Sequence, residues 1–213
     1  MQLNLSKSKI EELTKDFILD NPKITIYEDV LKPIGDEHYL FLAALSMQIK
    51  NKKIIECGTH NGRSTYSLYY GNKKLNNNNM IYTYDINLFL ANHIFDDTNI
   101  VFNMDDLFDK NVRELNKEHI LSSDLLFIDI DPHEGVLEYE MYCWLKENDY
   151  QGLLLLDDIH LKEGHMNVNT GNSMQKFWDK IEDEYKMDLT SVGHYSGTGI
   201  VSFHLENYSI TID

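Results

Sequence analysis

Short apolar segments that carry an acidic residue at or near their end recur along this chain of 213 residues. Five of them have the length of a strand, and segments with helix-compatible periodicity separate them. These five segments are Lys53–Cys57, Met80–Asp85, Asn99–Asp106, Ser123–Asp131 and Gly152–Asp158. Segments this apolar are typical of parallel strands that are buried on both faces of a sheet. The pattern therefore predicts an α/β protein with a mostly parallel sheet.

The remaining periodicity predicts helices and two further strands. Helices are expected at Ser8–Leu19, Glu37–Ile49, from near Arg63, Asp106–Leu115, Tyr139–Glu147 and Ser173–Tyr185. The two strands, Met187–Gly193 and Gly199–Leu205, flank a turn-rich sequence and predict an antiparallel edge. No repeat or linker divides the chain, so we expect one domain over 1–213, in which residues 1–50 form a helical cover and residues 51–213 the core.

The most informative local sequence is KIIECGTHNGRST, Lys53–Thr65, which predicts a strand, a tight turn and a helix. Gly58 and Gly62 allow positive φ and leave the backbone open to a ligand. The N–H groups at the start of the helix favour an anion, whereas Glu56 favours a ligand with hydroxyl or ammonium groups. A tight connection that binds no ligand would have the same spacing, so this turn alone does not establish a site.

The acids at the strand ends strengthen the prediction of a site. In an open α/β sheet, ligands bind outside the carboxyl ends of the strands. All five predicted strands place acids there, which indicates a common binding edge. A solvated acidic surface is the alternative explanation of these acids.

Composition excludes several classes of protein. The net charge of −16 disfavours nucleic acid binding, which needs clustered Lys and Arg. No apolar run approaches the roughly 20 residues that span a bilayer, so no membrane partner is expected. The N-terminal sequence lacks the apolar region of a secretion signal, and the two cysteines, Cys57 and Cys143, are too few for a disulfide framework, so a cytoplasmic protein is expected. No paired Cys/His spacing indicates a zinc site.

From about Tyr39 to Leu205 the chain resembles class I S-adenosylmethionine-dependent methyltransferases. The first motif of that family, acid-x-Gly-x-x-x-Gly-x-Ser, is matched by Glu56, Gly58, Gly62 and Ser64. The resemblance implies a Rossmann-like, doubly wound, mostly parallel seven-stranded sheet with an antiparallel edge strand. It also implies that this turn holds the methionine part of S-adenosylmethionine.

Acids after the next two strands extend the resemblance. Asp85 matches the acid that binds the ribose hydroxyls, and a carboxylate suits a vicinal diol because it accepts two hydrogen bonds. Asp105 or Asp106 falls where the family lines the adenine. A solvated loop or a helix N-cap is the alternative role of these two residues.

The sequences FIDIDPHEG and LLLLDDIH, Phe127–Gly135 and Leu153–His160, are similar to the metal-dependent O-methyltransferase branch, above all to its sugar-modifying macrocin O-methyltransferase type. The resemblance implies that Asp129, Asp157 and Asp158 hold Mg²⁺, an ion that prefers oxygen ligands. Alternatively, Asp158 caps the next helix and Asp129 is solvated.

Three residues are candidate general bases. Asp131 is favoured because it matches the second aspartate of the sugar branch, and His133 and His160 are rivals because histidine titrates near neutrality. Catechol-type enzymes carry a lysine where this chain has Pro132, which favours a sugar or another diol over a catechol. His165, in a segment rich in polar residues, is a candidate for a substrate lid or an ordinary surface loop.

We therefore expect an O-methyltransferase that uses S-adenosylmethionine and Mg²⁺ and acts on a hydroxyl of a small, preferably sugar-like molecule. The sequence is compatible with a homo-oligomer. Two alternatives stay open, namely the same fold with a different, hydroxylase-like activity and a non-catalytic partner that binds the cofactor.

Overall fold

A seven-stranded sheet forms the centre of the protein in the computed structural model, which describes residues 1–22, 27–87, 97–163 and 171–212. The strand order is β4-β3-β2-β5-β6-β8-β7. The strands are β2 (Lys53–Cys57), β3 (Met80–Tyr84), β4 (Ile100–Asn103), β5 (Leu125–Ile128), β6 (Leu153–Asp157), β7 (Lys186–Asp188) and β8 (Thr198–Val201). The first five strands in this order pair in parallel, and β8 pairs antiparallel with both β6 and β7. The predicted mostly parallel sheet with an antiparallel edge is therefore confirmed.

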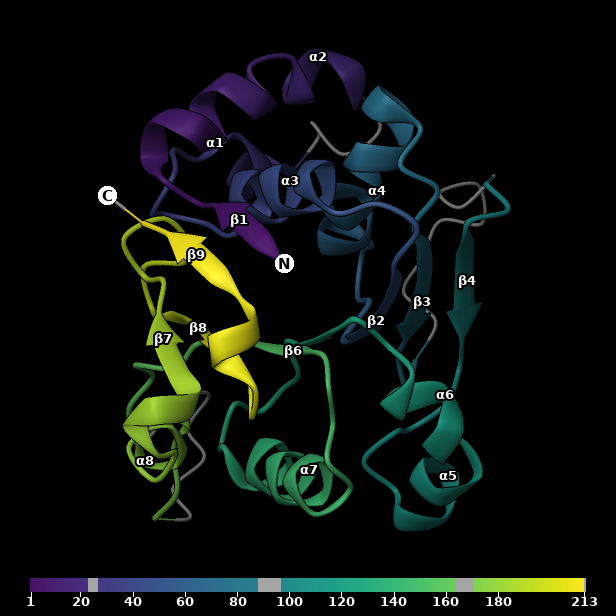
Figure 1. The fold of residues 1–213 in the computed structure, drawn as a ribbon, viewed down its shortest axis with the longest axis vertical. Helices are drawn as coiled ribbons and strands as arrows, with labels where there is room; N and C mark the ends of the chain where they lie inside the picture. The colour runs from purple at the N-terminus through teal and green to yellow at the C-terminus, as the bar shows by residue number, and fades with distance from the viewer. Residues whose placement is uncertain (23–26, 88–96, 164–170, 213) are drawn as a thin grey trace.

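Helices cover both faces of the sheet (Figure 1). One side carries α1 (Lys7–Thr14), α2 (Phe17–Asp20), α3 (Tyr39–Gln48) and α4 (Arg63–Leu75). The other side carries α5 (Lys110–Leu115), α6 (Lys117–Leu121), α7 (Val136–Glu147) and α8 (Met174–Trp178). Short 3₁₀ helices lie at Glu28–Leu31, Asp183–Tyr185 and Leu205–Asn207. Within the described ranges, no helix combines the length and apolar character needed to cross a membrane.

The sheet is buried on both faces because successive side chains of a strand point in opposite directions. In β5, Leu125 and Phe127 pack in the cluster that includes α1, α3 and α4, whereas Leu126 and Ile128 pack in the cluster that includes α7 and α8. These four side chains are buried. This two-sided burial explains why the strand sequences are apolar without alternation.

The two ends of the chain form a small second sheet that the sequence did not reveal. Strand β1 (Gln2–Asn4) pairs in parallel with β9 (Ser209–Thr211). The two strands lie side by side near the labelled termini in Figure 1. Each strand has three residues, which is too short for a periodic signal, and the pairing joins segments about 200 residues apart.

The predicted boundaries of three elements in the last third of the chain are wrong. The strand expected over Gly199–Leu205 ends at Val201. The helix expected over Ser173–Tyr185 ends at Trp178, where the side chain of Lys186 donates to the Trp178 carbonyl. The strand expected over Met187–Gly193 ends at Asp188, whose carboxylate accepts the N–H and hydroxyl of Thr190 and turns the chain. The Asp188 side chain satisfies a backbone N–H two residues further on, whereas the Lys186 side chain reaches the Trp178 carbonyl from eight residues away. His165 lies outside the described residues.

Candidate active site

A cavity of 440 Å³ lies at the carboxyl ends of β2, β3 and β5. It lies where an open parallel sheet binds ligands. Eight residues predicted for the site line it, namely Gly58, Ser64, Asp85, Asp105, Asp106, Asp129, Asp131 and His133. Five others do not, namely Glu56, Gly62, Asp157, Asp158 and His160.

The turn between β2 and α4 approaches the end of β5 closely. Gly58 has a φ of +101°, and a Cβ added there would come closer than 3.0 Å to the backbone carbonyl oxygen of Asp129. Gly62 has a φ of +76° and caps the start of α4. The positive φ explains why glycine occupies both positions. At Gly58, the missing Cβ also allows the turn to approach Asp129 at the end of β5.

Glu56 is completely buried beneath this turn rather than exposed in the cavity. Its Oε2 accepts hydrogen bonds from the hydroxyls of Thr65 and Thr83, the latter at 2.6 Å, whereas Oε1 has no hydrogen-bond partner among the described residues. Burial raises the pKa of Glu56, and the hydroxyls of Ser64, Thr65 and Thr83 oppose this. Glu56 thus stabilises the turn through its hydrogen bonds, and Gly58 and Ser64 are the motif residues that line the cavity.

Asp85 joins the end of β3 to the glycine turn. Its two carboxylate oxygens accept the backbone N–H groups of His60, at 2.8 Å, and Asn87, at 2.9 Å. These hydrogen bonds orient the carboxylate in the cavity wall.

Asp105 and Asp106 both line the cavity, and Asp106 also has a local structural role. It accepts the N–H of Phe108 at 2.8 Å. The N-cap of α5 is Asp109, so neither candidate caps that helix. This contact favours Asp105 as the residue available to a ligand.

At the edge of the cavity, the three aspartates predicted to bind metal alternate with histidines. His38 Nε2 lies 3.9 Å from Asp129 Oδ2, and His38 Nδ1 lies 3.3 Å from Asp157 Oδ2. His194 Nδ1 lies 3.0 Å from Asp157 Oδ2 and 3.3 Å from Asp158 Oδ1. The acids therefore gather at the ends of β5 and β6, with imidazole rings between them.

Charge in this cluster shifts the pKa values strongly. Burial and the negative charge of Asp157 raise the pKa of Asp129 to about 7. Burial opposes ionisation of Asp157, but His38 and His194 outweigh it and lower the Asp157 pKa below its ordinary value. Burial lowers the pKa of His194, yet Asp157 and Asp158 outweigh it and raise the pKa to about 11. The same competition raises the pKa of His38, mainly through Asp157. Without a cation, the histidines neutralise the acids.

The three candidate bases differ in position. His133 contacts two carboxylates, with Nε2 at 3.0 Å from Asp131 and Nδ1 at 3.1 Å from Asp158. The Asp131 side chain is 70% exposed, and both Asp131 and His133 line the cavity. His160 is instead paired with Asp188 of β7 at 2.8 Å and does not line the cavity. The structure thus brings Asp131 and His133 together and leaves His160 apart.

Sequence reasoning missed four residues of this region. His38 and Tyr39 come from the start of α3, Arg63 from the start of α4 and His194 from the loop between β7 and β8. Tyr39 and Arg63 line the cavity, and Arg63 lies over the Tyr39 ring and pairs with Asp29. A single residue at a helix start or in a turn belongs to no motif with a recognisable spacing, so only the fold reveals that these four residues lie near the site.

No protein-family model and no curated protein sequence matches this chain. Solved structures do resemble it. The SAH-bound methyltransferase PaMTH1 of Podospora anserina is 12% identical, with 76% of each chain covered and a TM-score of 0.51. A structure described as cmcI-D160 with Mg and SAM is 13% identical, with 75% of this chain and 68% of that one covered and a TM-score of 0.52. The MycE methyltransferase structure with Mg, SAH and mycinamycin VI is 15% identical, covers 71% of this chain and 44% of its own, and has a TM-score of 0.47.

The two likenesses with TM-scores above 0.5 show that the chain has the fold of S-adenosylmethionine-dependent methyltransferases, as the first motif predicted. At 12% and 13% identity they establish the fold alone.

Proposed function

We propose that this protein transfers a methyl group from S-adenosylmethionine to a hydroxyl of a small molecule, in a site that also binds a divalent cation. The observation that carries the proposal is the acid-lined cavity of 440 Å³ at the strand ends, bordered by the Gly58 turn. Its volume falls within the roughly 300–1,000 Å³ of small-molecule pockets.

The cavity suits S-adenosylmethionine chemically. Asp85 and Asp105 provide acceptors for ribose hydroxyls and amino groups, and their charges complement the positive sulfonium and ammonium groups. Ser64 and the start of α4 provide donors for the cofactor's carboxylate. Leu107 and Phe108 offer apolar surface for the adenine ring of the cofactor. The structures of PaMTH1 with SAH and of cmcI with Mg and SAM support the same choice.

The acids at the ends of β5 and β6 fit a divalent cation. Asp157 is 3% exposed, and its Oδ1 has no hydrogen-bond partner among the described residues, which is costly for a buried carboxylate. Asp129, Asp157 and Asp158 would supply oxygen ligands, and Mg²⁺ is the ion that the resemblance implies. When bound, such an ion would lower the pKa of a substrate hydroxyl.

The chain's own residues supply orientation and proton removal. The turn at Gly58 and the carboxylate of Asp85 orient the methyl donor, which is required for in-line attack by the acceptor oxygen. Asp131 and His133, 3.0 Å apart at the cavity wall, are placed to accept the proton that this oxygen loses. Asp158, 3.1 Å from the other nitrogen of His133, orients its ring. The preferred acceptor is a sugar or another aliphatic diol.

Calorimetric titration with SAH tests the cofactor site. We expect binding by the wild-type protein and an affinity about 10- to 100-fold weaker in Asp85→Ala, because a charge-assisted pair of hydrogen bonds is lost. Asp183→Asn is a matched control, since the Asp183 side chain is 99% exposed and does not line the cavity. A wild-type protein that binds neither S-adenosylmethionine nor SAH would refute the proposal.

The acceptor is to be identified by screening sugars, nucleotide sugars and phenols with a radiolabelled methyl donor. Asp158→Ala separates the catalytic role from the alternatives. Lost turnover with intact SAH binding supports catalysis, whereas unchanged turnover would remove Asp158 and its cation from the reaction.

A further inference from the structure

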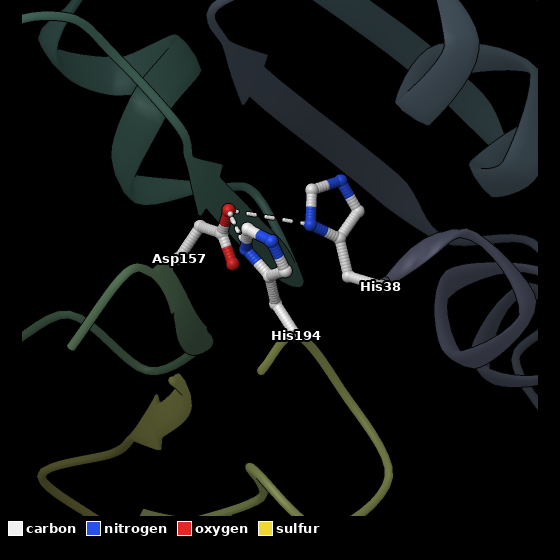
Figure 2. Close-up of side chains that lie close together, drawn as sticks. All are labelled: His38, Asp157 and His194. Atoms are coloured by element: carbon white, nitrogen blue, oxygen red, sulfur yellow. Dashed lines mark hydrogen bonds and ion pairs between the residues drawn. The ribbon is translucent and has the colours of Figure 1, made fainter. Parts of the chain in front are cut away.

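His38, Asp157 and His194 form a mixed nitrogen and oxygen site at the end of β6. One ligand atom from each residue lies within 4.8 Å of the other two, and within the described ranges this is the one such group of three or more His, Cys, Asp or Glu. Figure 2 shows both rings beside the Asp157 carboxylate, His38 from the start of α3 and His194 from the loop before β8. Three distant segments thus converge on one carboxylate.

We propose that the cation of the proposed function is bound through His38 and His194 as well as Asp157, and that it is a borderline transition-metal ion such as Mn²⁺, Co²⁺ or Zn²⁺ in preference to Mg²⁺. This inference rests on the proposed cation site but changes its ligands and its ion. Mg²⁺ requires oxygen ligands, whereas imidazole nitrogen suits these borderline ions.

Unsatisfied polar atoms are the second observation that indicates a ligand. His38 is 3% exposed, and neither of its ring nitrogens has a hydrogen bond with acceptable geometry among the described residues. Oδ1 of the equally buried Asp157 is in the same condition. A buried polar atom without a hydrogen bond of good geometry is costly. A bound ion would satisfy atoms of both residues at once.

The surrounding charge also favours a divalent ion. Asp129 lies 3.9 Å from His38, Asp158 lies 3.3 Å from His194, and Glu37 lies 3.6 Å from the other nitrogen of His194. Together with Asp157, these three residues bring four carboxylates around the imidazole rings of His38 and His194. A divalent ion would offset the negative charge that these carboxylates bring together.

The site is next to the chemistry of the proposed reaction. Asp129 lines the cavity and also contacts His38, so an ion at His38 and Asp157 would lie at the cavity wall. His38 immediately precedes α3, and the ion would therefore also tie the N-terminal segment to β6.

The test uses protein freed of metal with EDTA and then titrated with Mn²⁺, Co²⁺ or Mg²⁺. We expect Mn²⁺ and Co²⁺ to bind at least about tenfold more tightly than Mg²⁺. Calorimetry in buffers of different ionisation enthalpy should detect proton release on binding. Pulsed electron paramagnetic resonance of the Mn²⁺ protein should show coupling to imidazole ¹⁴N.

Variants assign the nitrogen ligands. His38→Gln and His194→Gln should each weaken Mn²⁺ binding about tenfold or more and remove part of the nitrogen coupling, with SAH affinity unchanged. His204→Gln is the matched control, because His204 pairs with Asp149 at 3.0 Å just as His194 pairs with Asp157 at 3.0 Å. It should leave Mn²⁺ binding unchanged.

Three outcomes would overturn the inference: Mg²⁺ binding as tightly as Mn²⁺, wild-type Mn²⁺ protein without ¹⁴N coupling, or folded histidine variants with unchanged affinity. The spectroscopic measurement on wild-type protein decides the matter even if His38→Gln does not fold. Failure of SAH binding would refute the proposed function and leave the metal site standing, so the two failures are distinguishable.

Discussion

Replacement of Gly58 by alanine tests the contact on which the cavity depends, between the turn after β2 and the end of β5. The added Cβ would lie closer than 3.0 Å to the carbonyl oxygen of Asp129, and this neighbour is backbone that cannot rotate away. The residue would also keep a φ of +101°, which L-residues rarely adopt. Two separate costs therefore act at this position.

Gly171→Ala isolates the cost of the positive φ, without the steric contact. Gly171 has a φ of +78°, and no heavy atom lies within 4 Å of a Cβ added there. The left-handed conformation costs roughly 1–2 kcal/mol for a non-glycine residue, so Gly171→Ala should lose about that much. Gly58→Ala should lose about 1–3 kcal/mol more, because overpacking must displace the end of β5.

Urea denaturation of both variants measures these losses as changes in the free energy of unfolding. In thermal denaturation, each kcal/mol corresponds to roughly 2–4 °C in a protein of this size. SAH affinity should fall in Gly58→Ala and stay unchanged in Gly171→Ala. Equal destabilisation of the two variants would show that the turn does not press against β5, and our account of the cavity wall would then be wrong.

Two further predictions concern the base and a buried acid. With the acceptor found in the screen, Asp131→Asn should lower kcat about 100-fold or more, because it removes the general base. His160→Gln should leave kcat unchanged. If kcat instead falls in His160→Gln and not in Asp131→Asn, His160 is the base. Burial raises the pKa of Glu138 from 4.5 to about 7, so ionisation is penalised in the folded state and stability falls as pH rises through this window. Glu138→Gln should therefore stabilise the protein by up to about 3 kcal/mol at pH 8 and hardly at pH 4.5. Thermal unfolding at both pH values checks this, and an equal effect at each would contradict it.

The sequence predicted the five parallel strands and the acids at their ends because this information is local. A strand buried on both faces must be apolar throughout, as in β5 and β6, and this composition can be read without knowledge of neighbours. The carboxyl ends of parallel strands share one edge of the sheet, so Asp85 and Asp129 were expected to meet, and both line the cavity.

Tracts with little apolar character were harder to interpret. The polar sequence Asn76–Asn79 has the composition of a simple loop, and it does connect α4 to β3. Yet Asn77 and Asn79 are buried, and their amide groups donate to the carbonyls of Ser46 and Ile49 around the end of α3. An asparagine has the same appearance in a sequence whether it satisfies buried carbonyls or water.

The sequence by itself determined which apolar segments form the parallel strands and that acidic residues lie at the ends of these strands. Only the tertiary structure decided that His38 and His194 stand beside Asp157, because packing of α3 and the β7–β8 loop against β6 brings together residues that no spacing relates. The physical reason is that backbone periodicity reports which face of a strand or helix is buried, whereas a cluster of ligands depends on how separate elements pack.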